Sequence, residues 1–103
     1  MLDYATEAMD MVRGRERSHL EQDRQLSLAL VRLLEIVGEA ASRITADFRM
    51  EHGQIPWADI VGLRNRLIHG YDSVDPDILW DILEGDLPPL VEQLGKLLAD
   101  REE

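Results

Sequence analysis

The hydrophobic positions along the chain repeat at helical spacing. Apolar residues recur every three or four positions, and no segment shows the period-two alternation that is typical of a strand. The clearest pattern predicts one long helix from about Asp23 to Phe48 or Met50, with apolar positions at Leu26, Leu30, Leu33, Leu34, Val37, Ala41, Ile44 and Phe48. A second apolar set on the same helix predicts contacts on more than one side, and it comprises Leu28, Val31 and Ile36.

Shorter helical segments flank this long helix. We expect one from about residue 3 to residue 15 and another from about 57 to 69. A further helix is predicted to begin after Asp75, with Asp75 as its N-cap and Pro76 at the first helical position. The glycine and the two prolines of residues 85–89 are expected to interrupt this helix. The chain therefore predicts an all-α fold, a four- to five-helix antiparallel bundle that forms a single domain over residues 1–103.

Most of the negative charge of the chain is concentrated in its C-terminal third. The formal net charge is 11 − 21 = −10, and residues 72–103 carry ten acidic and two basic residues, which is −8. Residues 25–71 are balanced, with five arginines and five acidic residues. The acidic end predicts a solvated helix face, and a chain of this charge is expected to bind nucleic acid poorly unless its cations are clustered. The chain shows no transmembrane segment and no secretion signal, so we expect a soluble, cytoplasmic protein.

Several classes of chemistry are excluded by the residue types. The chain has no cysteine, which removes disulfides, thiolate catalysis and cysteine-ligated metals. The histidines at 19, 52 and 69 do not have metal-ligand spacing, and neither a phosphate-binding glycine loop nor a serine nucleophile turn is present. Asp72, Asp75 and Asp77 could gather a hard cation, but capping is the better interpretation of Asp75. We therefore predict no metal site.

Residues 62–71 do not follow the pattern of a helix that packs on a core. On a helical wheel, Arg64 lies at the centre of the apolar sector formed by Trp57, Ile60, Val61, Leu63, Leu67 and Ile68. A core-facing helix would not place an arginine there, because burying an unpaired charge is costly. Asn65 and His69 are four residues apart on the edge of this sector, and Arg66 is expected to face solvent.

Two interpretations of this stretch remain open from geometry alone. In the structural interpretation, Arg64 pairs with a carboxylate of the long helix such as Glu39, and His69 caps a helix end. In the functional one, Arg64, Asn65, His69 and Tyr71 form a site, because residues able to bind phosphate and to move protons are concentrated within eight positions.

The same residues carry a resemblance to a known superfamily. The run Arg64-Asn65-Arg66-Leu67-Ile68-His69-Gly70-Tyr71 resembles the R-x(4–6)-H motif of the HEPN superfamily. The tyrosine two residues after the histidine is similar to the HepT-like branch, the toxins of HEPN/MNT toxin–antitoxin pairs. The resemblance extends in order along nearly the whole chain, through Ile36-Val37-Gly38-Glu39-Ala40, Ile55-Pro56-Trp57, Val74-Asp75, Ile78-Leu79-Trp80 and Leu87-Pro88.

The resemblance implies a metal-independent endoribonuclease without a cofactor, working as a homodimer or higher assembly with two motifs facing a shared cleft. In this role Arg64 would offset charge on the RNA phosphate, because a guanidinium donates two parallel hydrogen bonds. His69 would move a proton near neutral pH, and Asn65 would orient the histidine or the phosphate. Glu39 and Arg66 are candidates for supporting roles.

The resemblance also implies a partner. The antitoxin of the HepT-like branch is a minimal nucleotidyltransferase that transfers AMP to a tyrosine, which here is Tyr71, and an anionic adduct beside Arg64 would repel RNA. Two other functions stay open: a non-catalytic substrate-binding subunit of a two-component nucleotidyltransferase, and a helical interaction protein with a vestigial motif. Loss of RNA cleavage on Arg64→Ala would distinguish the ribonuclease from both.

Overall fold

The computed structural model describes residues 1–69 and 73–102, with side chains for residues 1–67 and 75–99. Within these residues the fold is all-α, as predicted. The helices are α1 (Leu2–Met11), α2 (Arg17–Gln22), α3 (Arg24–Ser42), α4 (Ala46–Glu51), α5 (Trp57–Val61), α6 (Leu63–Leu67), α7 (Pro76–Asp81) and α8 (Leu87–Glu102), and a π-helix, η1 (Ile82–Asp86), joins α7 to α8. Two short strands, β1 (Ile68–His69) and β2 (Ser73–Val74), pair antiparallel, with Ile68 opposite Val74 and His69 opposite Ser73.

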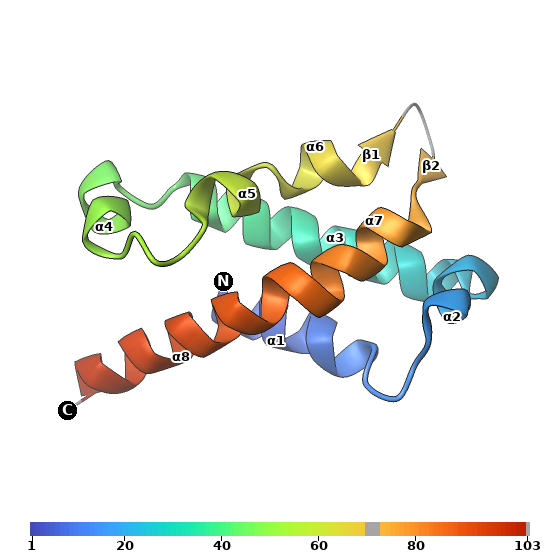
Figure 1. Ribbon diagram of the computed structural model, residues 1–103, viewed down its shortest axis with the longest axis horizontal. Coiled ribbons are helices and arrows are strands. Elements are labelled where there is room, and N and C mark those ends of the chain that lie inside the picture. The colour runs from blue at the N-terminus through green and yellow to red at the C-terminus, as the bar shows by residue number, and fades with distance from the viewer. Residues whose placement is uncertain (70–72, 103) are drawn as a thin grey trace.

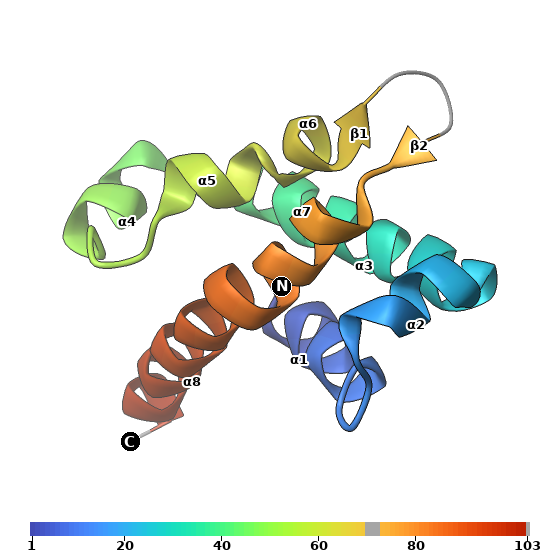
Figure 2. The ribbon, with the colours of Figure 1, turned by 45° about the vertical axis from the view of Figure 1, so that its right-hand side comes forward.

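Four successive helical segments run in alternating directions along the long axis of the molecule. They are α1, α3, the pair α5–α6 and the run α7–η1–α8 (Figure 1). α3 lies in the middle, with α5 and α6 along one side and α1 on the other, while α8 packs on α1 (Figures 1 and 2). This arrangement places α6 and the β1–β2 pair on one edge of the molecule, away from α1 and α8.

The core is built around α3, as its two apolar sets predict. Its buried residues are Leu26, Leu30, Val31, Leu34, Val37, Gly38 and Ala41. These contact α1, α2, α5 and α6, so the prediction of neighbours on more than one side is confirmed. Leu28 is the exception within the second set, since it is exposed, and Ile36 is only half-buried.

The long helix ends earlier than predicted. The prediction extended it to Phe48 or Met50, but α3 stops at Ser42 and a separate helix, α4, begins after Thr45. The Thr45 hydroxyl accepts a hydrogen bond from the Phe48 N–H at 3.2 Å, which makes Thr45 an N-cap. Arg49 of α4 donates to the carbonyl of Ala41 at 2.8 Å, so it satisfies a carbonyl at the end of α3. The apolar pattern continued across this break because both helices face the same core.

The predicted helix over residues 57–69 is divided at Gly62 and ends at Leu67. The start is anchored by Trp57, whose Nε1–H donates to the His52 carbonyl at 3.1 Å. The break lies against Gly38 of α3, where a Cβ would lie 3.2 Å from the carbonyl oxygen of Ile60. The absence of a side chain at Gly38 therefore allows α3 and the end of α5 to approach closely.

The C-terminal half is more continuous than predicted. Asp75 caps α7 as expected, because its carboxylate accepts the Asp77 N–H at 2.8 Å and Pro76 occupies the first turn. The predicted interruption at residues 85–89 is wrong, since η1 leads directly into α8. Pro88 and Pro89 lie in the first turn of α8, where missing N–H groups are tolerated, and the Leu87 N–H bonds back to the Ile82 carbonyl in π-helical geometry. No helix in the described part of the chain has the length and apolar character needed to cross a membrane.

Candidate functional site

Arg64 lies on the outer side of α6 and is exposed. The prediction that it occupies the centre of the apolar sector is wrong, because α6 is a single five-residue helix whose buried side chains are Leu63 and Leu67. Val61 belongs to α5 and Ile68 to β1, so neither extends the apolar face of α6 toward Arg64. None of the ion pairs within the described residues involves Arg64.

Arg66 forms an ion pair of the kind that the structural interpretation gave to Arg64, but its partner lies on η1 and not on the long helix. The prediction of a solvent residue is wrong: the guanidinium of Arg66 is partly covered and lies 2.5 Å from a carboxylate oxygen of Asp86. Asp86 belongs to η1, so this ion pair ties α6 to the π-helix that follows α7. The contact holds the helix carrying Arg64 against the C-terminal half of the molecule.

Asn65 and His69 follow Arg64 along the edge of the molecule. Asn65 is exposed on α6. His69 lies in β1, two residues beyond the end of α6, so the predicted helical spacing between Asn65 and His69 does not exist. Tyr71 lies outside the described residues. The backbone thus places His69 directly after the helix that presents Arg64.

A groove lies between α3 and the exposed side of α6. Its volume is about 540 Å³. It is lined by Arg32, Glu35, Ile36, Glu39, Ala40, Arg43 and Arg64. The structure therefore brings Arg64 and the predicted supporting residue Glu39 to one groove, although the two are far apart in sequence. Figures 1 and 2 both show α6 alongside α3 at this position.

The charges in the groove favour an anionic ligand. Glu39 pairs with Arg43 at 3.2 Å and not with Arg64, so the predicted structural pairing of Arg64 with Glu39 is wrong. Arg32 faces Glu35 at 3.6 Å. The groove holds three guanidinium groups and two carboxylates, which leaves one cation in excess on a chain whose net charge is −10.

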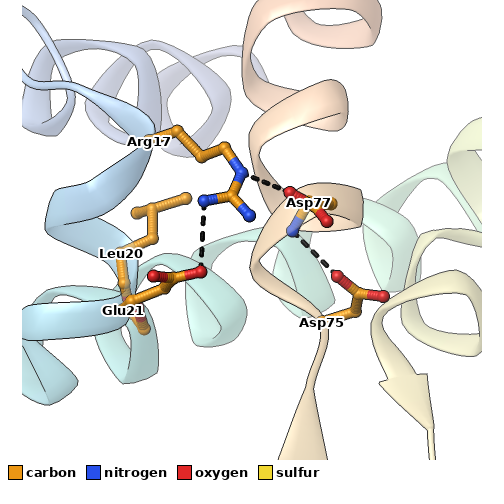
Figure 3. Close-up of polar contacts among 6 residues, drawn as sticks. Arg17, Leu20, Glu21, Asp75 and Asp77 are labelled. Carbon is orange, nitrogen blue, oxygen red and sulfur yellow. Dashed lines mark hydrogen bonds and ion pairs between the residues drawn. The ribbon is translucent and has the colours of Figure 1, made fainter.

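A second ion pair supports the chain just after β2. Arg17 of α2 donates from Nε to a carboxylate oxygen of Asp77 on α7, and its Nη1 contacts Glu21 at 3.1 Å (Figure 3). The hydrogen bond to Asp77 is the main reason that the pKa of Arg17 is raised, with the charges of both carboxylates adding to it. Asp75 caps α7 and Asp77 pairs with Arg17, so both help to hold α7. Asp72, the third aspartate that was considered and set aside as a cation ligand, lies outside the described residues.

Sequence reasoning missed three residues of this region. Asp86 lies within the predicted helix break of residues 85–89, and Arg32 and Arg43 were not predicted to belong to a site. The spacing of Arg32, Ile36, Ala40 and Arg43 along one face of α3 was a usable signal for the groove wall. No pattern in the sequence, however, indicates that α6 lies beside this face.

Comparisons with known proteins define the class to which this all-α fold belongs. A model of the family described as "Ribonuclease HepT-like" matches residues 1–97. "Putative RNase TTE0752" of Caldanaerobacter subterraneus subsp. tengcongensis is 36% identical, covering 87% of this chain and 80% of that protein. "Putative RNase MJ1380" of Methanocaldococcus jannaschii is 33% identical, covering 91% and 86%, and "Probable ribonuclease HepT" of Thermococcus cleftensis is 40% identical, covering 73% and 68%. No solved structure matches the chain.

The protein is therefore a ribonuclease by its family. The chain belongs to the ribonuclease HepT-like family, and with it to the HEPN superfamily that the motif resembles. The predictions of the family and of an endoribonuclease are confirmed at this level. The substrate class that follows is RNA.

Proposed function

We propose that this chain is a metal-independent endoribonuclease toxin that cuts RNA through Arg64, Asn65 and His69. The observation that carries the proposal is the position of Arg64: an exposed guanidinium, outside every described ion pair, at the edge of a groove with a surplus of cations. A phosphodiester carries one negative charge, and a guanidinium can bind two of its oxygens at once.

The reaction needs only groups that RNA and this motif supply. The 2′-oxygen of the RNA attacks the adjacent phosphorus and loses its proton to a base, a new O–P bond forms, and the bond from phosphorus to the 5′-oxygen breaks. That oxygen takes a proton, which leaves a 2′,3′-cyclic phosphate and a 5′-hydroxyl. Arg64 stabilises the additional charge on the phosphoryl oxygens, and His69 serves the proton transfers. Asn65, exposed beside Arg64 on α6, positions the phosphate or the histidine.

The test is cleavage of a single-stranded RNA by the purified chain in excess EDTA. Wild-type protein should cut and leave cyclic phosphate ends, while Arg64→Ala and His69→Ala should each lower the rate by about 10²-fold or more, since each removes a group that acts in the transition state. Arg13→Ala is the matched control, because Arg13 is an exposed arginine of the N-terminal region that pairs only with Asp10.

The outcomes separate this function from its alternatives. Equal cleavage by all variants would assign the activity to a contaminant. Intact RNA from folded protein with unmodified Tyr71 would contradict the proposal and favour a substrate-binding subunit of a nucleotidyltransferase. Because Arg64 is exposed, its removal should leave the thermal unfolding midpoint unchanged.

The regulation we propose acts through Tyr71. A minimal nucleotidyltransferase antitoxin would transfer AMP from ATP to the phenolic oxygen, releasing pyrophosphate, and the adduct would place a negative charge two residues after His69. Incubation with the cognate nucleotidyltransferase and ATP should add one or more AMP masses to the peptide containing Tyr71 and abolish cleavage. An adduct on another residue, or a Tyr71→Phe variant that is still neutralised, would contradict this part of the proposal.

A further inference from the structure

Two of the three arginines that line the groove, Arg32 and Arg43, come from α3 and from its C-cap position. Arg32 and Arg43 are 11 positions apart, which at 1.5 Å per residue separates them by about 16 Å along the helix axis on nearly the same face. Arg64 reaches the same groove from α6. The floor between the arginines includes the aliphatic side chains of Ile36 and Ala40, which are half-buried.

Both outer arginines are free to exchange partners. The side chains of Arg32 and Arg43 are 71% and 78% exposed, and each pairs only with a helical neighbour, at 3.6 Å to Glu35 and 3.2 Å to Glu39. Exposed pairs of this kind are weak because water screens both charges. A polyanion that enters the groove can therefore displace the carboxylates without breaking any part of the core.

We propose that Arg32 and Arg43 bind backbone phosphates of a single-stranded RNA segment that lies in the groove between α3 and α6, and so bring its scissile phosphate to Arg64. This inference rests on the proposed function. A stacked strand carries one charge for each 3.4 Å or so, so a separation of about 16 Å corresponds to roughly five nucleotides. The aliphatic floor gives bases and riboses a surface to pack on, and recognition is therefore of strand shape and charge, with little dependence on sequence.

The experiment is equilibrium binding of a fluorescein-labelled, 12-nucleotide single-stranded RNA with 2′-O-methyl riboses, which cannot be cleaved by its own 2′-oxygen. Affinity is measured by anisotropy between 25 and 200 mM KCl. The double variant Arg32→Gln/Arg43→Gln should weaken binding by about 10-fold at low salt and reduce the slope of log affinity against log salt by about 1.4, since each phosphate contact contributes about 0.7. On cleavable RNA it should raise KM more than it lowers kcat.

Two further variants separate a groove from general electrostatics. Arg13→Gln removes one similarly exposed arginine that also pairs with a neighbour along the chain, Asp10, and it should leave affinity and slope unchanged. Glu39→Gln removes a carboxylate that competes with phosphate for Arg43, and it should tighten binding. Weaker binding by the double variant and tighter binding by Glu39→Gln, beside unchanged binding by Arg13→Gln, identify this face of α3 as the binding surface.

Three results would overturn the inference. If the double variant binds like Arg13→Gln while Arg64-dependent cleavage persists, RNA does not follow this groove and the proposed function stands. If wild-type protein neither binds the RNA nor cleaves in an Arg64-dependent manner, the proposed function fails and the inference fails with it. If the double variant changes the native mass by light scattering but not the RNA affinity, the face is an interface between copies of the chain.

Discussion

Arg64 and Arg66 are two positions apart on α6, but they have opposite roles. Arg64 is exposed and belongs to the groove, whereas Arg66 is held by Asp86 at 2.5 Å. Periodicity alone placed Arg64 in the apolar sector and Arg66 in solvent, because it treated residues 57–69 as one uninterrupted helix. The ion pair of Arg66 means that a substitution there is expected to act on activity through the placement of α6.

The Arg66–Asp86 pair should contribute measurably to stability. Its side chains are 38% and 31% exposed, so solvent screening limits the coupling to about 1 kcal/mol. A double-mutant cycle with Arg66→Gln and Asp86→Asn, measured by urea unfolding, should show this coupling, and both single variants should also cleave RNA more slowly. The same cycle on Arg13 and Asp10, which are 79% and 52% exposed, should give a value near zero. Equal coupling in the two cycles would show that Arg66 does not anchor α6.

At the scale of elements, two helical glycines have contrasting surroundings. Gly38 of α3 faces the end of α5, where an added Cβ would be 3.2 Å from the Ile60 carbonyl oxygen, while Gly95 of α8 has open space around it. Replacing glycine by alanine in a helix gains up to about 1 kcal/mol when nothing obstructs the methyl group. We therefore expect Gly95→Ala to raise the free energy of unfolding by about 0.5–1 kcal/mol.

Gly38→Ala should not show this gain, because the methyl group must push α5 outward. We expect an unchanged or lower free energy of unfolding, together with slower RNA cleavage, since α5 leads directly into the helix that carries Arg64. Urea unfolding and cleavage rates on both variants check the prediction. Similar stabilisation by both alanines, with cleavage unaffected, would contradict the role assigned to Gly38.

Removal of the cap at Asp75 gives another prediction at this scale. Asp75→Ala should lower the free energy of unfolding by about 1 kcal/mol, because the Asp77 N–H loses its acceptor at the start of α7. Thermal unfolding measures the effect. Asp75→Asn serves as the control, since asparagine caps helices about as well as aspartate, and it should stay close to wild type. An equal loss in both variants would show that the charge, not the cap, is what matters.

The elements that the sequence predicted well are those with local causes. The start of α7 follows from Asp75 and Pro76 alone, and the core face of α3 follows from its own apolar spacing. The end of α3, by contrast, depends on Arg49 returning from α4 to the Ala41 carbonyl, and the division at Gly62 lies where α5 meets Gly38. The candidate site was only partly predictable for the same reason: the motif is contiguous, but the wall of its groove comes from another helix.

At the scale of the molecule, Arg64, Asn65 and His69 lie at one edge, along which a second copy could align its own motif. We propose that the active unit is a dimer with two motifs in a shared cleft. Light scattering after gel filtration should give twice the chain mass of 11.8 kDa at micromolar concentration. Cleavage per chain should fall on dilution in step with the dimer population. A monomeric mass with full activity at every dilution would contradict a shared cleft.

The π-helix between α7 and α8 has a consequence for how this chain can vary. In a π-helix each backbone N–H donates to the carbonyl five residues earlier, as Leu87 does to Ile82, and not four residues earlier as in an α-helix. η1 therefore contains one residue more than an α-helix between Trp80 and Leu87 would contain. Loss of one residue here, for example the exposed Gly85, would convert the run into ordinary α-helix and still leave α8 leading out of α7. The same deletion would withdraw the carboxylate of Asp86 from Arg66. Length variation at this point would therefore change how firmly the motif helix is held while leaving the packing of the bundle intact.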